Sequence, residues 1–197
     1  MTTTEVAAGE QRRRLLDGMA DAIRRRGYAE TTVADVVRAA RTSRRTFYAH
    51  FADRQECLVA LLRESNQRTI ARIRGAVDPR ATWDRQIRQA IEAWIAAVQI
   101  DPPITLSWIR DVPALGSRAR ELQRETMEAF IALIQQLTDT ESLRAAGVRS
   151  PTHQSATVLL GGLRELIAMT VEDGGDVNDI AEVAVEATML LLGPRSG

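Results

Sequence analysis

The stretch that decides the fold is residues 31–58, which read TTVADVVRAARTSRRTFYAHFADRQECL. Apolar residues recur in it at helical spacing over 33–40 and again over 44–50, and residues 41–43 form the connection. A capping-box pattern at Thr32 marks where the first of these two helices begins. Two short helices joined by three residues, with a longer helical pattern on each side, predict a helix-turn-helix motif.

The second short helix of this motif carries side chains suited to the major groove of DNA. Phe47 and Phe51 lie four residues apart and are expected to face inward. Arginine can bind guanine through two hydrogen bonds and threonine can contact a base, whereas hydroxyl, imidazole and helix N-terminal groups bind phosphates. We therefore predict base contacts from Arg44, Arg45 and Thr46, and phosphate contacts from Thr31, Thr32, Tyr48, His50 and Arg54. A packing role for Tyr48 and a local capping role for His50 are the alternatives.

The same stretch resembles the DNA-binding signature of the TetR family of bacterial transcriptional regulators. The positions that carry the resemblance are Thr31-Thr32, Ala40, Ser43, Thr46-Phe47-Tyr48, His50-Phe51, Arg54, Glu56 and Leu58. The resemblance adds Ser43 to the residues expected at the DNA. The chain departs from the family at the turn, where Arg41-Thr42 replaces glycine and valine. Because arginine lacks the freedom of glycine at positive φ, we expect a turn built differently and a phosphate contact from Arg41.

Charge is distributed unevenly along the chain. Its 26 basic residues are all arginine and balance 26 acidic residues, so the net charge is zero. Residues 1–74 contain 15 arginines and 9 acidic residues, whereas residues 75–197 contain 11 arginines and 17 acidic residues. This asymmetry favours a basic module that meets a polyanion and an acidic body with another task. A chance fluctuation on solvated helix faces is the alternative.

The rest of the chain also has helical periodicity, so we predict an all-α fold. Asp78-Pro79 interrupts the pattern, and residues 138–150 are polar and predict a loop. Ser150 followed by Pro151 predicts the start of a helix. The expected organisation is a flexible N-terminus (1–9), a helix-turn-helix domain (10–56) and a larger C-terminal domain (57–197), joined by a helix over 53–75. The further helices are expected over 11–26, 82–99, 101–110, 117–137, 151–172 and 178–192.

The C-terminal domain contains no specific motif, and its role follows from the resemblance. Two wide apolar stripes over residues 156–167 and 180–191 form either simple core or a four-helix homodimer interface. A dimer also suits a pseudo-palindromic operator on double-stranded DNA, because half-sites lie about one helical turn apart. The resemblance further implies a small-molecule inducer among the middle helices. The expected lining is Trp94, Trp108, Met127 and Phe130, with polar contacts from Arg110 and Gln123. Ordinary core packing is the alternative for each.

Several classes of protein are disfavoured by the residues present. The single cysteine, Cys57, and the distant His50 and His153 argue against a disulfide framework and a metal site, and Cys57 is expected to be structural. No nucleophile–base pair or glycine-rich phosphate loop indicates an enzyme, and no cofactor is expected. Without a signal peptide or an apolar run of about 18 residues, a cytoplasmic protein is expected. The sequence thus predicts a transcriptional regulator, and favours a repressor over an activator. A helical adaptor for an acidic protein and a helical enzyme are the alternatives.

Overall fold

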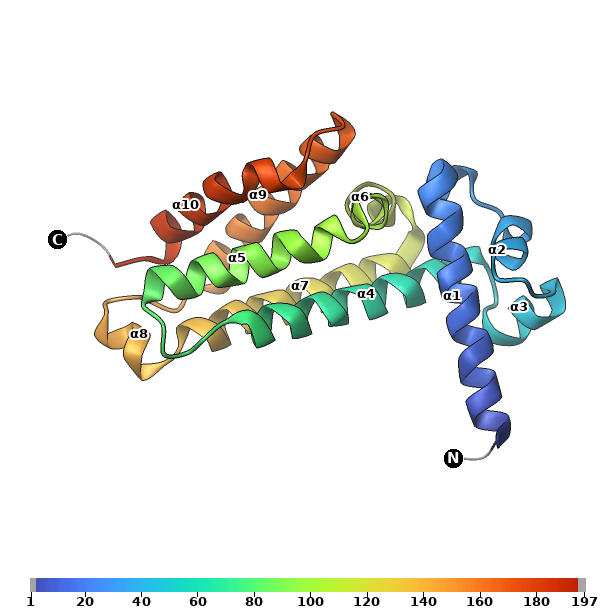
Figure 1. The fold of residues 1–197 in the computed structure, drawn as a ribbon, viewed down its shortest axis with the longest axis horizontal. Coiled ribbons are helices and arrows are strands. Elements are labelled where there is room, and N and C mark those ends of the chain that lie inside the picture. Colours follow the sequence, from blue (N-terminus) through green and yellow to red (C-terminus); the bar gives the residue numbers. More distant parts are fainter. Residues whose placement is uncertain (1–2, 195–197) are drawn as a thin grey trace.

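Helices build the entire fold (Figure 1). The computed structural model describes residues 3–194, and every regular element in that range is helical, which confirms the predicted all-α class. The elements are α1 (Thr3–Glu30), α2 (Val33–Ala39), α3 (Arg44–His50), α4 (Arg54–Ala76), α5 (Trp83–Gln99), α6 (Pro102–Arg110), η1 (Val112–Ala114), α7 (Gly116–Thr138), α8 (Glu141–Ala145), α9 (His153–Glu172), η2 (Val177–Ile180) and α10 (Ala181–Leu192).

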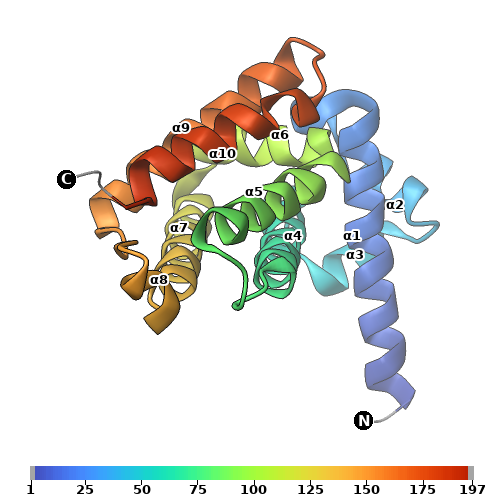
Figure 2. The ribbon, with the colours of Figure 1, turned by 60° about the vertical axis from the view of Figure 1, so that its left-hand side comes forward.

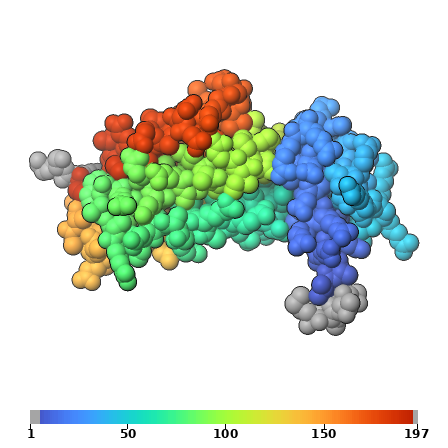
Figure 3. Space-filling model, in the orientation of Figure 1, coloured from blue at the N-terminus to red at the C-terminus, as the bar shows by residue number. Residues whose placement is uncertain are grey.

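The molecule has a small N-terminal lobe and a larger C-terminal one. Helices α1 to α3 gather at one end, with α1 lying across the start of α4, and Figure 3 shows this lobe in blue beside the rest. In the C-terminal lobe, α4, α5 and α7 run lengthwise, and α9 and α10 cover them on one side (Figures 1 and 2). Helix α4 belongs to both lobes, so it is the continuous connection between the helix-turn-helix motif and the middle helices.

Apolar residues at helical spacing form one continuous core through both lobes. In the N-terminal lobe, Leu15 and Met19 of α1 are fully buried together with Phe47 of α3. In the C-terminal lobe, α5 buries Ile87, Ile91 and other apolar residues along one face, against α4 and α10. Because these faces are one helical stripe wide, burial of that stripe fixes the rotation of each helix and therefore which side chains remain outside.

Gly18 sets how closely α2 approaches α1. A Cβ atom added at Gly18 would lie 2.6 Å from the carbonyl oxygen of Val36 and 2.9 Å from the Cβ of Ala40. Since the first of these atoms is backbone, the helix pair must separate to admit a side chain. The absence of a side chain at Gly18 therefore positions α2, on which the motif is built.

We expect Gly18→Ala to lower the free energy of unfolding by about 1–3 kcal/mol, the usual cost of overpacking a well-packed core. Urea unfolding measures the change. Gly9→Ala is the matched control, because Gly9 lies in the same helix with no atom within 4 Å of an added Cβ. This control should be neutral or slightly stabilising, since alanine favours helix over glycine. Equal stability of the two variants would contradict the close approach.

Three predicted boundaries are wrong. Helix α1 begins at Thr3, so residues 3–9 of the segment expected to be flexible are helical. The predicted loop over 138–150 contains α8, which buries a single apolar residue, Leu143, and so gives no periodic signal. Helix α9 begins after Thr152, whose side chain accepts a hydrogen bond from the backbone N–H of Ser155. Pro151 lies before this cap, and its carbonyl oxygen accepts a hydrogen bond from the Gln135 side chain.

Candidate nucleic-acid interface and ligand cavity

Helix α3 presents its first turn to solvent on a buried aromatic base. Phe47 is fully buried and Phe51 nearly so, and their ring centroids lie 5.7 Å apart. Ser43 is the N-cap, and its Oγ accepts a hydrogen bond of 3.0 Å from the backbone N–H of Thr46. Arg44 and Arg45 are exposed, as is Tyr48, whose side chain is 58 % exposed. The arginines predicted to read bases therefore share one accessible helix turn that the two phenylalanines anchor.

The two remaining polar residues of α3 lie partly against the lobe. The Thr46 hydroxyl is 2.9 Å from that of Ser43, which orients both at the start of the helix. His50 is half-buried, with its ring 6.4 Å from that of Phe51. Residues 36–52 contain no acidic side chain, so this segment contributes only positive or neutral groups to the surface. Such a surface is electrostatically complementary to a phosphate backbone.

The turn between α2 and α3 has the conformation that glycine favours, even though arginine occupies it. Arg41 has a φ of 50°, in the left-handed region. The backbone N–H groups of Arg41 and Thr42 donate to the carbonyls of Arg38 and Val37, which is the Schellman pattern of a helix end. The expectation of a differently built turn is therefore wrong. The exposed Arg41 side chain remains a predicted phosphate contact, and its backbone strain is typical of functional positions.

Thr32 closes a capping box at the start of α2. Its Oγ1 accepts a hydrogen bond from the backbone N–H of Asp35, whose carboxylate in turn accepts from the Thr32 backbone N–H at 3.0 Å. Donation from the Thr32 hydroxyl and backbone holds the pKa of Asp35 below its usual range. The two residues thereby fix the start of α2, and Thr32 remains exposed.

Thr31 and Arg54 hold the lobe together instead of facing outward. Thr31 is fully buried, and its hydroxyl donates 2.7 Å to the carbonyl of Gly27. One Arg54 guanidinium nitrogen donates to the carbonyls of Tyr28, Ala29 and Thr31, and the group lies 4.3 Å above the Tyr28 ring. These contacts use the groups predicted to bind phosphates, so the structure does not support that prediction for Thr31 or Arg54.

We expect Arg54→Ala to cost about 2–3 kcal/mol of unfolding free energy, because it removes charge-assisted hydrogen bonds from several carbonyls and the contact with Tyr28. Urea unfolding measures this loss, and Arg54→Lys should restore only part of it, since lysine lacks the planar fork. If Arg54 instead contacted a DNA phosphate, its removal would affect DNA binding and not stability. Full stability in Arg54→Ala, together with a smaller dependence of DNA affinity on salt, would show that Arg54 contacts the duplex.

Cys57 lies in the core at the start of α4, as its expected structural role requires. The thiol is fully buried, and burial raises its pKa to about 12. The thiolate is the reactive form, so we expect negligible alkylation of the native protein by iodoacetamide at pH 8. Denaturation in urea should make Cys57 react at the rate of a free thiol. Mass spectrometry measures the extent of alkylation. Rapid alkylation of Cys57 in the folded protein would contradict its buried position.

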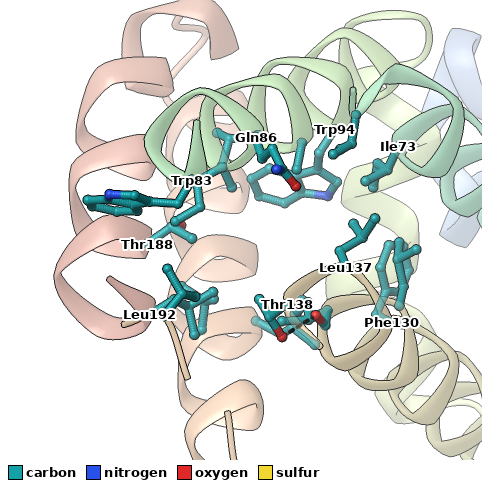
Figure 4. A pocket seen from close by; sticks show the side chains of 18 of the residues that line it. Ile73, Trp83, Gln86, Trp94, Phe130, Leu137, Thr138, Thr188 and Leu192 are labelled. Carbon is teal, nitrogen blue, oxygen red and sulfur yellow. Dashed lines mark hydrogen bonds between the residues drawn. The ribbon is translucent and has the colours of Figure 1, made fainter. Parts of the chain in front are cut away.

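An apolar cavity of about 100 Å³ lies between α4, α5, α7, α9 and α10. Figure 4 shows Trp83, Thr188 and Leu192 at one end of it and Ile73, Leu137 and Phe130 at the other. Apart from the tryptophans, its polar lining side chains already have hydrogen-bond partners within the chain. These side chains are Gln86, Thr138 and Thr188, which donate to the carbonyls of Ala81, Ile134 and Ala184 at 2.7–2.8 Å. The cavity is therefore suited to an apolar group.

The residues predicted to line a ligand site divide between this cavity and a smaller one beside it. Trp94 and Phe130 line both, whereas Trp108 and Met127 line the smaller cavity of about 40 Å³ and not the larger of the two. Gln123 also lines the smaller cavity, but Arg110 is held outside by Glu165 and Glu172 at 2.7–2.9 Å. The sequence alone did not indicate Arg164, which borders the smaller cavity, because a single arginine in a helix forms no recognisable pattern.

One ion pair joins the two lobes at the side of α4. Arg24 of α1 donates to the carboxylate of Asp101 at the start of α6, with an Nε–Oδ2 distance of 2.9 Å. The hydrogen bonds that Arg24 donates to the Asp101 carboxylate raise the pKa of Arg24. A larger cavity of about 230 Å³, which both residues line, extends from this pair to Trp94 and Phe130. A change in the shape of this cavity would therefore act directly on α1.

Two further observations concern residues 3–194. Within this range no group of three or more histidine, cysteine or acidic side chains is arranged to hold a metal ion. None of the helices in the same range is both long enough and apolar enough to cross a membrane.

Comparisons with known proteins identify the N-terminal lobe and the fold. Residues 15–61 match the family model for bacterial regulatory proteins of the tetR family. No curated protein matches the sequence. Among solved structures, the transcriptional regulator FadR from Bacillus subtilis, solved in complex with stearoyl-CoA, is 16 % identical with a TM-score of 0.77, covering 93 % of this chain and 98 % of that one.

Two other solved structures share the fold. The fatty acid degradation regulator FadR from Bacillus halodurans has a TM-score of 0.75 at 16 % identity, over 92 % of this chain and 98 % of that chain. The reduced form of NemR from E. coli has a TM-score of 0.72 at 16 % identity, over 95 % and 100 %. At this identity the similarity shows a shared fold. The match at residues 15–61 adds that the N-terminal lobe is similar to the bacterial regulatory proteins of the tetR family.

Proposed function

We propose that this regulator is a homodimeric repressor that occupies a pseudo-palindromic operator on double-stranded DNA and is released by a small molecule. The observation that carries the proposal is the exposed first turn of α3, where Arg44 and Arg45 project from the anchored helix and form no ion pair with another described residue. We assign base reading to these two residues and Thr46. Phosphate contacts are assigned to Arg41, Ser43, Tyr48 and His50, with Thr32 at the start of α2.

The proposal divides the chain into a DNA-binding domain (10–56) and a domain for ligand binding and dimerisation (57–197). The exposed apolar side chains of α9 and α10 support dimerisation through these helices. They are Val158, Met169, Val183, Leu190 and Leu191, with exposed fractions of 39–81 %. Exposed apolar groups gathered on two neighbouring helices are typical of a covered surface. A second copy would bury them and place two recognition helices about one turn of DNA apart.

The apolar cavity supports a small-molecule inducer. A protein with this fold was solved in complex with stearoyl-CoA, which favours a ligand for this chain as well. We assign Trp94, Trp108, Met127 and Phe130 to its site. Ligand and operator would each weaken the binding of the other by the same coupling free energy, typically about 1–3 kcal/mol. The regulator is proposed to act in the cytoplasm and without catalytic activity.

Fluorescence anisotropy with the duplex upstream of the protein's own gene tests the DNA-binding part. The expected result is binding that weakens with salt and is at least 10³-fold tighter than binding to an unrelated duplex of equal length. A helical adaptor that uses the same basic surface for an acidic protein would bind both duplexes equally. Equal affinity for the two duplexes, or no binding to either, would therefore overturn the proposal.

A further inference from the structure

A surface groove beside the smaller cavity is rich in arginine. The groove between α7 and α9, about 600 Å³ in volume, is lined by Ser117, Arg120, Gln123, Arg124, Met127 and Arg164. None of these side chains is acidic. We call Arg120, Arg124 and Arg164 the arginine mouth. Within residues 3–194 none of the three forms an ion pair, whereas Arg63, Arg88, Arg110 and Arg144 of the same lobe do.

Three acidic residues near the arginine mouth are engaged by other side chains, whereas Glu121, next in sequence to Arg120, forms no ion pair among the described residues. Glu125 pairs with Arg63 at 2.9 Å, and Glu128 lies 2.9 Å from the ring of His153. Glu165, next in sequence to Arg164, is held by Arg110. The three arginines therefore form a local excess of positive charge within a domain that is acidic as a whole. Such an arrangement is complementary to an anion.

Arg164 is the inner member of the arginine mouth. Its Nε is buried and has no hydrogen-bond partner within the described part of the chain. Burial lowers the pKa of its guanidinium, which reflects the cost of holding the charge away from water. Buried charged groups in folded proteins usually have partners, so an unpartnered guanidinium nitrogen beside a cavity indicates a missing acceptor.

The route inward from Arg164 is apolar. The small cavity that Arg164 borders is also lined by Trp94, Phe130 and Leu160, and the same three residues line the apolar cavity. Figure 4 shows Trp94 of α5 and Phe130 of α7 along the wall of that cavity. The arginine mouth, the smaller cavity and the apolar cavity therefore adjoin one another, with Trp94 and Phe130 in the shared wall of the two cavities.

We propose that the C-terminal domain binds an anionic amphiphile, with its carboxylate or phosphate head among Arg120, Arg124 and Arg164 and its apolar body between Trp94 and Phe130. This inference rests on the proposed function in taking the cavity as the ligand site, and it adds the chemical class of the ligand. Each CH₂ group that enters the cavity should tighten binding roughly fourfold, the equivalent of about 0.8 kcal/mol per buried CH₂.

Binding of three twelve-carbon probes tests the proposal, with intrinsic tryptophan fluorescence as the readout. Dodecanoate and dodecyl phosphate carry the two candidate heads, and dodecanol has the same chain without charge. We expect at least one of the anions to bind tenfold or more tightly than dodecanol, with an affinity that falls as salt screens the charge. Stronger binding of the phosphate would assign the dianionic head, and stronger binding of dodecanoate the carboxylate.

Arg164→Met should remove this preference while retaining dodecanol binding, because methionine keeps much of the side-chain length without the charge. Arg118→Met is the matched control, since Arg118 is exposed on the same helix as Arg120 and lies outside the mouth. Urea unfolding of both variants verifies that they fold. An unchanged preference in Arg164→Met, or equal binding of all three probes to the wild type, would overturn the inference and leave the proposed ligand cavity intact.

Two further outcomes distinguish failure of this inference from failure of the proposed function. If none of the probes binds, both the anionic ligand and the apolar ligand cavity fail, whereas dimerisation and operator binding are still measured independently. If Arg164→Met weakens self-association in sedimentation experiments and leaves probe binding unchanged, the missing acceptor belongs to a second copy of the chain. That result would also overturn the inference.

Discussion

Replacing Arg44 and Arg45 together by alanine should abolish sequence-selective DNA binding while leaving the fold intact. Each base-reading arginine is worth about 1–3 kcal/mol of discrimination, so the pair should weaken operator binding by roughly 30-fold to 10⁴-fold. Both side chains are exposed and outside any ion pair of the described residues, so stability should change by less than about 0.5 kcal/mol. Anisotropy titrations with operator and unrelated duplexes measure the two affinities.

The control for this variant removes the same charge elsewhere. Arg80→Ala with Arg85→Ala deletes two exposed arginines from the C-terminal lobe and should leave the selectivity between duplexes unchanged. Tyr48→Phe should weaken binding evenly across sequences, because a phosphate contact carries no sequence information. If the Arg44/Arg45 variant still distinguishes the operator from unrelated DNA, α3 is not the element that reads bases.

Glutamate at Val158 and Leu190 should convert the proposed dimer to monomers. These side chains are 68 % and 81 % exposed in the single chain, and a symmetric interface would bury each of them twice. Loss of about 1.5–3 kcal/mol per buried apolar side chain, with added charge repulsion, predicts at least a 10⁴-fold weaker dimer. Analytical ultracentrifugation measures the association, and operator affinity should fall with it because a monomer reaches one half-site.

Ala129→Glu is the matched control, since it adds the same charge at an exposed position of α7. It should remain dimeric with full operator affinity. Circular dichroism should show unchanged helix content in all variants, because the substituted residues contribute to no core. A Val158/Leu190 variant that sediments as a dimer would show that these helices are not the interface.

Sequence patterns predicted the helix-turn-helix elements to within one residue because capping and burial act together there. Ser43 and Thr32 have the cap chemistry, and Phe47 has the spacing, so local and tertiary preferences agree. Helix α8 shows the opposite case. One buried leucine and a threonine cap are sufficient for a single turn of helix, but they do not produce a period that a sequence can display.

The candidate site was less predictable than the fold because roles depend on which way a side chain turns. Thr31 and Thr32 are adjacent and chemically alike, yet one is fully buried and the other exposed. Arg54 and Arg44 have the same guanidinium, but the carbonyls of Tyr28 and its neighbours lie within reach of only the first. Residue type indicated donors for phosphates, whereas the available acceptors inside the lobe decided which donors remain free.

The cavity residues illustrate the same limit at longer range. Trp94 and Phe130 come from helices that are distant in sequence, and only packing brings both to one wall. The residue type alone does not distinguish a tryptophan or phenylalanine that packs in the core from one that lines a cavity. Arg164 could be identified only from the structure, because the observation that singles it out is a buried Nε with no hydrogen-bond partner among the described residues.

The length of helix α4 means that a small tilt at one end produces a large displacement at the other. It begins at Arg54, beside the recognition helix, and extends 23 residues to Ala76, past Ile73 in the wall of the apolar cavity. At 1.5 Å per residue it is about 34 Å long, so a tilt of roughly 3° at one end displaces the other by about 2 Å. A ligand that tilts α4 by a few degrees would therefore be sufficient to move the recognition helices of the proposed dimer out of register with the two half-sites.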